Sequence, residues 1–73
     1  MMKAVCIDDE KLALEYMTHL LKKVDNVEVV ESFQQAEKGL EFILLESIDV
    51  VFLDIQMPEI DGLELAEKIL EKK

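Results

Sequence analysis

This sequence of 73 residues has few of the residues that are typical of disulfide-linked, zinc-binding or nucleic-acid-binding proteins. It has one cysteine, so no disulfide can form within the chain, and it has no Cys/His pattern typical of structural zinc. It contains no arginine, and eight lysines face seventeen acids, which gives a net charge of −9. This charge argues against a nucleic-acid partner for this chain and against anionic membrane surfaces. It suits a metal cation or a basic protein partner.

Long apolar runs are also lacking. None approaches the roughly 18 residues of a membrane span, and acids at positions 8–10 interrupt the N-terminal run too early for a signal peptide. We therefore expect a cytoplasmic protein, which the lone thiol of Cys6 also fits. The composition is 51% hydrophobic and 34% charged, which is typical of an ordered globular chain. Its length allows a single domain over residues 1–73.

Hydrophobic periodicity predicts three strand–helix units in succession. Strands are predicted at 2–7, 27–33 and 49–55, and helices at 10–24, 35–46 and from 62 to the end. The continuous apolar run in the third strand is typical of a strand covered on both faces, whereas the second alternates around its glutamates as at a sheet edge. Strands and helices that alternate at this spacing predict an α/β fold with a parallel sheet and right-handed crossovers.

The apolar residues of each predicted helix recur at three- and four-residue spacing, so each helix should bury one face. The predicted inward residues are Ala13, Tyr16, Met17, Leu20, Leu21 and Val24 in the first helix, Ala36, Leu40, Ile43 and Leu44 in the second, and Leu63, Ala66, Ile69 and Leu70 in the third. Capping boxes are predicted at Ser32–Gln35 and Asp61–Glu64, because a hydroxyl or carboxylate precedes Gln or Glu by three residues. Gly39 should weaken the second helix slightly.

Three acids follow predicted strands. Asp8 and Asp9 come just after the first strand, and Asp54 lies near the end of the third. Neighbouring parallel strands lie about 4.8 Å apart, so the three carboxylates meet at one sheet edge if the first and third strands are neighbours. Like charges this close need a proton or a cation, and oxygen ligands suit Mg²⁺. Alternatively, Asp9 and Glu10 only cap the next helix, which spacing alone favours.

The residues around these acids resemble those of a known family. Val-Cys-Ile-Asp-Asp-Glu at 5–10, followed by a helix, is similar to the opening of a CheY-like response-regulator receiver domain. Residues 49–65, Asp-Val-Val-Phe-Leu-Asp-Ile-Gln-Met-Pro-Glu-Ile-Asp-Gly-Leu-Glu-Leu, resemble the family's phosphoacceptor segment, with Asp54 in the acceptor position. The residues of these two segments are most similar to those of transcriptional regulators, among them those with a LytTR-type DNA-binding domain.

The resemblance implies a fold and a function. The fold would be flavodoxin-like with strand order 2-1-3-4-5, of which this chain would supply a truncated (βα)3 unit of order 2-1-3. The function would be that of a phosphoprotein in a two-component system, not of an enzyme: Asp54 would accept phosphate from a sensor histidine kinase. The resemblance also implies Mg²⁺ bound by Asp8, Asp9, Asp54 and the backbone carbonyl of Gln56.

The sequence departs from the family after the third strand–helix unit. The strand-four Ser/Thr and strand-five Lys that contact the phosphoryl group in receivers have no counterpart in residues 1–73, so we expect phosphorylation of Asp54 to be impaired. The third strand would become an apolar sheet edge without blocking Lys or Pro. We therefore expect a homodimer in which third strands pair antiparallel. The alternative function is a truncated half-domain whose only activity is this self-association.

Overall fold

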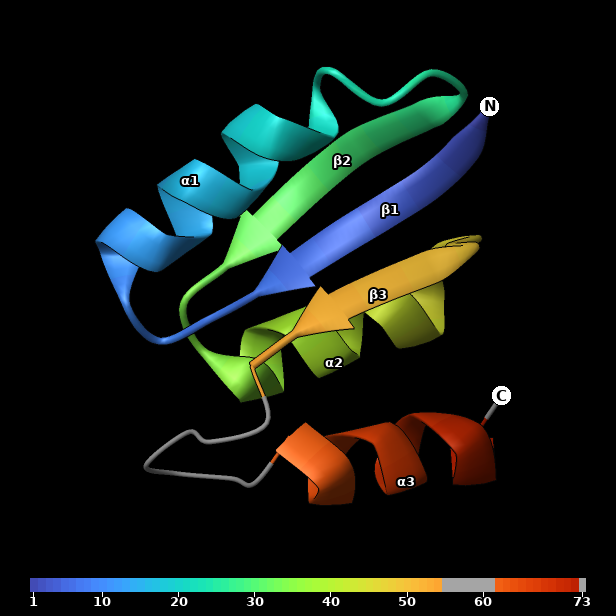
Figure 1. Ribbon diagram of the computed structural model, residues 1–73. Helices are drawn as coiled ribbons and strands as arrows, with labels where there is room; N and C mark the ends of the chain where they lie inside the picture. The colour runs from blue at the N-terminus through green and yellow to red at the C-terminus, as the bar shows by residue number, and fades with distance from the viewer. Residues whose placement is uncertain (55–61, 73) are drawn as a thin grey trace.

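The structure, a computed structural model, describes residues 1–54 and 62–72 and alternates strands with helices (Figure 1). Its elements are β1 (Met2–Ile7), α1 (Lys11–Leu21), β2 (Val27–Phe33), α2 (Ala36–Leu45), β3 (Val50–Leu53) and α3 (Gly62–Lys72). All six predicted elements are present. The helix α1 ends earlier than predicted because the chain turns before β2, and Asn26 in that turn has a left-handed φ of 68°, which asparagine tolerates.

The three strands form one parallel sheet in the order β2-β1-β3, which confirms the predicted fold class. The chain crosses from β1 to β2 in one direction and then returns past β1 to β3 in the other. Right-handed crossovers in opposite directions place their helices on opposite faces of a sheet. Figure 1 shows this arrangement, with α1 on one face and α2 and α3 on the other.

The central strand β1 is also the centre of the core, because it has a neighbour on each side and helices over both faces. Its last four residues, Ala4, Val5, Cys6 and Ile7, are 0% exposed. Side chains alternate along a strand. Two of these residues, Val5 and Ile7, therefore share one face, where they cluster with Ala36, Ile43 and Leu65 from α2 and α3.

The edge strand β2 contains an irregularity that its sequence only hints at. Glu28 and Glu31 are three residues apart, so strict alternation would send them to opposite faces. In the register, Ala4 pairs with Val29 and Val5 with Glu31, which leaves Val30 as an extra residue. Both glutamates are exposed, while Val30 packs against the core.

The prediction for the buried face of α1 is wrong in part. Leu14, which was not predicted to be inward, is only 7% exposed, whereas Tyr16, Leu20 and Val24 are 65%, 43% and 48% exposed. The helix carries two apolar rows at helical spacing, and the second begins at Leu12, which is 78% exposed. Periodicity does not distinguish the rows, because contact with the sheet decides which of them is buried. The remaining predicted residues are half-buried: Ala13, Met17 and Leu21.

The prediction for α3 is also wrong in part. Leu65 is 0% exposed and joins the core, whereas the predicted inward residues Leu63 and Leu70 are 64% and 79% exposed. The predicted Ala66 and Ile69 are half-buried. The helix packs beside α2 (Figure 1), so it buries a narrow row rather than a wide face. Among the helices of residues 1–54 and 62–72, none is long and apolar enough to cross a membrane.

The helix α2 begins differently from the prediction. Its N-cap is Gln35 without a side-chain capping bond, and Ser32 lies within β2, paired with Cys6. The predicted capping box at Ser32–Gln35 is therefore wrong, because the strand continues through Ser32. The box at Asp61–Glu64 begins outside the described residues.

Gly39 brings α2 close to β1. A Cβ atom at this position would lie 2.5 Å from Ile7 Cδ1 and 3.5 Å from Phe33 Cδ2. The lack of a side chain, which costs helix propensity, therefore permits a close helix–strand contact that periodicity does not reveal.

The strand β3 is shorter and less covered than predicted. It runs over Val50–Leu53, whereas the prediction was 49–55, of which residue 55 lies outside the described residues; all four residues of β3 are half-buried. Within the described residues it pairs only with β1, so it forms the second edge of the sheet.

Candidate functional site

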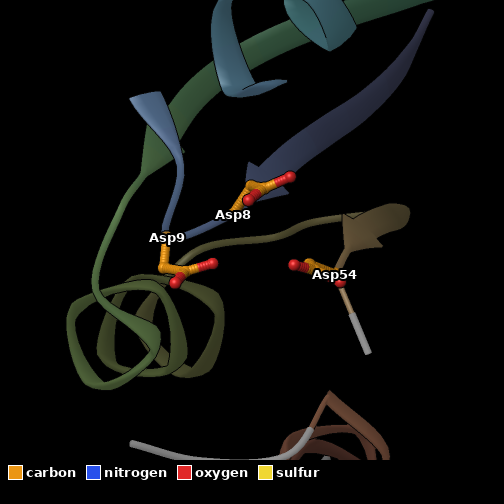
Figure 2. A group of neighbouring side chains, drawn as sticks. All are labelled: Asp8, Asp9 and Asp54. Atoms are coloured by element: carbon orange, nitrogen blue, oxygen red, sulfur yellow. The ribbon is translucent and has the colours of Figure 1, made fainter. Parts of the chain in front are cut away.

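Three carboxylates meet where the sheet ends. Asp8 follows β1 directly and is 7% exposed, Asp9 comes next, and Asp54 follows β3; the last two are half-buried. One oxygen from each lies within 4.8 Å of the others. Figure 2 shows the carboxylates of Asp9 and Asp54 pointing toward each other across the gap between the two loops. The structure thus brings together the three acids that the sequence singled out.

Backbone hydrogen bonds place two of these acids. The Asp8 N–H donates to the carbonyl of Phe33 at 3.1 Å, and the Asp54 N–H donates to the carbonyl of Ile7 at 3.0 Å. Both bonds continue the ladders of the sheet by one residue beyond the strands. Each bond joins neighbouring strands of the sheet, so the strand order β2-β1-β3 determines where the backbones of Asp8 and Asp54 lie.

The capping alternative does not account for these acids. The N-cap of α1 is Glu10, and its side chain makes no capping hydrogen bond. Asp8 makes the local bond instead, since its Oδ1 accepts the Glu10 N–H at 2.9 Å. Asp9 is not the N-cap either, and its carboxylate points toward Asp54 (Figure 2).

The donor set fits a hard divalent cation. All three groups supply carboxylate oxygens, which Mg²⁺ and Ca²⁺ prefer over nitrogen or sulfur. Two oxygens on one Mg²⁺ are at most about 4.2 Å apart, because each bond is about 2.1 Å long. The span of 4.8 Å is therefore slightly wide for Mg²⁺, and small side-chain rotations would close it. The fourth predicted ligand, the carbonyl of Gln56, lies outside the described residues, as do Met57 and Pro58.

Cys6 lies in β1, two residues before Asp8. It is fully buried as a free thiol, and burial raises the pKa of the thiol above its ordinary value. A protonated, inaccessible thiol is neither a nucleophile nor a metal ligand. The structure agrees with its prediction as a small core residue.

The family model for the response regulator receiver domain matches residues 4–73. The chain belongs to the response regulator receiver domain family. The match confirms the predicted family, whose members are the receivers of two-component systems.

Among curated proteins, this receiver is similar to staphylococcal proteins named LytR. It is 36% identical to the transcriptional regulatory protein LytR of Staphylococcus aureus strain N315 and 38% identical to the sensory transduction protein LytR of Staphylococcus haemolyticus. Each match spans 72 residues and 99% of this chain, but only 29% and 28% of the relative. The chain thus covers less than a third of these relatives.

Solved receivers share the fold. The receiver domain of the response regulator NarL from Mycobacterium tuberculosis has a TM-score of 0.87 at 30% identity, over 96% of this chain and 56% of that one. A chain in the complex of histidine kinase ThkA with response regulator TrrA has a TM-score of 0.86 at 33% identity, over 100% of this chain and 61% of that one. This receiver spans somewhat more than half the length of these two chains.

Sequence reasoning missed the support behind the acids. Phe33 and Gln34, at the junction of β2 and α2, both bond to the β1–α1 loop: the Phe33 carbonyl accepts the Asp8 N–H, and Gln34 Nε2 donates to the Asp9 carbonyl at 3.4 Å. One feature of the sequence could have indicated this support, namely the order of the elements. If β2 lies parallel to β1, the residues that follow β2 lie near those that follow β1.

Proposed function

We propose that Asp54 is the phosphate-accepting residue of this receiver and that Asp8, Asp9 and Asp54 hold Mg²⁺ for the reaction. The observation that carries the proposal is the convergence of the three carboxylates within 4.8 Å at the end of a parallel sheet. Asp54 follows β3, the strand beside β1, which is where ligands of open α/β sheets bind. The proposed setting is the cytoplasm, with a sensor histidine kinase as phosphate donor.

In the proposed step, a carboxylate oxygen of Asp54 attacks the phosphorus of a phosphohistidine or of a small acyl phosphate. The new P–O bond forms as the bond from phosphorus to the leaving group breaks, and the leaving imidazole or carboxylate keeps the electron pair. The imidazole then takes a proton from water. When bound, Mg²⁺ would supply the positive charge that lets an anionic nucleophile approach an anionic phosphoryl group.

Asp8 and Asp9 serve as ligands in this proposal. Asp8 is nearly buried and uses Oδ1 to accept the Glu10 N–H, which leaves Oδ2 for the cation. Asp9 is half-buried and points at Asp54, so it can follow the cation with a small rotation. The proposed Gln56 carbonyl would complete the protein ligands, as in the family.

Mass spectrometry tests the proposal. The chain is incubated with acetyl phosphate and MgCl₂, and one adduct of about 80 Da is expected. Asp54→Asn should abolish the adduct, because an amide is not a nucleophile toward phosphorus. Asp25→Asn is the matched control, since Asp25 is an exposed acid in the turn before β2 and should leave the adduct unchanged. An adduct that persists in Asp54→Asn would overturn the assignment.

For the 73-residue chain by itself, we propose that the adduct forms slowly and decays quickly. Receivers hold and read the phosphoryl group with a Ser/Thr after strand four and a Lys after strand five. Charged hydrogen bonds of this kind are the strong ones, and a phosphoryl group without them loses its partner. Supplying a complementary segment that carries both residues should lengthen the lifetime of the adduct.

A second proposed activity is self-association through β3, as a homodimer. The observation that favours it is the edge position of β3, whose residues Val50–Leu53 are apolar and only half-buried. An exposed apolar edge is a template for another strand. Antiparallel pairing of Val50 with Leu53 of the second copy would oppose Asp49 to the other copy's Asp54, so Mg²⁺ and salt should both tighten the dimer.

Light scattering after size exclusion measures this directly. The proposal predicts a species of twice 8.4 kDa at micromolar concentration, and Val50→Lys, at a residue of β3 outside the core cluster, should return it to a monomer. A monomer under all salt and MgCl₂ conditions would exclude self-association, and it would leave the phosphate-accepting role unaffected.

A further inference from the structure

The three acids are not supported in the same way. Asp8 and Asp54 are held by backbone ladder bonds to Phe33 and Ile7. Asp9 lies one residue beyond the ladder, and its backbone carbonyl accepts a hydrogen bond from Gln34 Nε2 at 3.4 Å. Among residues 1–54 and 62–72, this is the one hydrogen bond to Asp9, and it comes from a side chain.

One peptide group joins this bond to the cluster. The Asp9 carbonyl and the Glu10 N–H belong to the same planar trans peptide, so they point in opposite directions. Gln34 Nε2 binds the carbonyl end, and Asp8 Oδ1 accepts the N–H end at 2.9 Å. The chain Gln34–peptide–Asp8 is therefore a continuous row of hydrogen bonds, in which each bond polarises the next.

The backbone on both sides of Gln34 is fixed by the fold. Its neighbour Phe33 ends β2, and the Phe33 ring packs against the core with its centroid 5.4 Å from that of Phe42 in α2. Its other neighbour, Gln35, is the N-cap of α2. The backbone of Gln34 is thus anchored on both sides, although its side chain is exposed.

We infer that Gln34 is a positioning residue for the cation site: its amide orients the Asp9–Glu10 peptide, which places the Asp9 carboxylate toward Asp54 and fixes the Asp8 carboxylate. The inference rests on the proposed function, because it concerns the affinity of the same three acids for a divalent cation. Groups that orient metal ligands typically change affinity by about 10- to 100-fold. The bond from Gln34 is long and exposed, so the expected effect is smaller, about threefold to tenfold.

The test uses the whole chain and MgCl₂ as the probe. Gln34→Met keeps the length of the side chain and removes its amide group, the Nε2 donor included, and Gln35→Met is the matched control one residue away. Calorimetric titration should show Mg²⁺ binding weakened about threefold to tenfold in Gln34→Met and unchanged in Gln35→Met. The melting temperature of the metal-free chain should be the same in both variants, because the bond is exposed.

A second measurement needs no metal. The Asp9 carbonyl carbon and the Glu10 amide nitrogen should shift in NMR spectra of Gln34→Met and not of Gln35→Met, since only the first loses the bond to that peptide. Equal Mg²⁺ affinity in Gln34→Met and the parent chain, or an unchanged Glu10 amide, overturns the inference and leaves the proposed function standing. A parent chain that binds no Mg²⁺ overturns the proposed cation site and the inference together.

Discussion

Replacing Gly39 with alanine places a methyl group 2.5 Å from Ile7 Cδ1 and 2.9 Å from Ile7 Cγ1. Ile7 is 0% exposed and lies in the core cluster, so its side chain can make room only by moving among packed neighbours. Overpacking of this kind costs about 1–3 kcal/mol. Alanine regains about 1 kcal/mol of helix propensity. The expected net loss is about 1 kcal/mol, or about 4–8 °C in the melting temperature of a domain this small.

The same change should reach the cation site. Ile7 immediately precedes Asp8, and its carbonyl accepts the Asp54 N–H at 3.0 Å. A displaced Ile7 therefore moves two of the three acids, so Gly39→Ala should also weaken Mg²⁺ binding.

A double-mutant cycle identifies the clash as the cause. Ile7→Val removes Cδ1, the nearest atom to the new methyl group, and costs about 0.5–1.5 kcal/mol alone. In the double variant Gly39→Ala/Ile7→Val the two losses should be less than additive, because the clash is relieved. Urea unfolding followed by circular dichroism measures all four proteins. A Gly39→Ala variant more stable than the parent, or strictly additive losses, would refute the close-contact reasoning.

Three further experiments test other features of the chain. Leu65→Ala should lower the free energy of unfolding by about 2–5 kcal/mol, whereas Leu63→Ala should change it by less than about 0.5 kcal/mol, in urea titrations of both. Asp9→Asn should raise the melting temperature without Mg²⁺, because it removes a like charge from the cluster, and should reduce the rise that MgCl₂ causes; a lower melting temperature in both conditions would contradict this. Burial raises the pKa of the Cys6 thiol in the folded chain above its ordinary value of 9.0. As the pH rises above 9.0, the thiol therefore ionises in the unfolded chain before it ionises in the folded chain. Stability from this group is present below that pH and is lost as the pH rises through the raised pKa of the folded thiol, so Cys6→Ala should reduce the pH dependence of unfolding in alkaline solution.

The position of the acids was predictable because the information that sets it is local. The apolar run of β1 stops at Asp8, that of β3 stops at Asp54, and parallel strands end at one edge. The resemblance to receivers also implied the strand order of the sheet, in which β1 and β3 are neighbours. Together, the strand ends and this order predict that the three carboxylates lie at one edge of the sheet.

The support behind the acids was not predictable in the same way. Gln34 reaches Asp9 only because β2 lies beside β1 and ends level with it, which is a relation between residues 25 positions apart. Gly39 reads as a weak point of α2 until the distance to Ile7 is known. Neither residue has a periodic or compositional signal.

The sequence by itself determined the succession of strands and helices, the α/β class and the three acids, because hydrophobic period and strand ends are local properties of the chain. Only the tertiary structure decided which apolar rows are buried. In α1 and α3 more than one row had helical spacing, and the sheet and α2 selected those containing Leu14 and Leu65. The reason is physical: spacing defines the rows of a helix, but contact with a neighbouring surface decides which row loses its water.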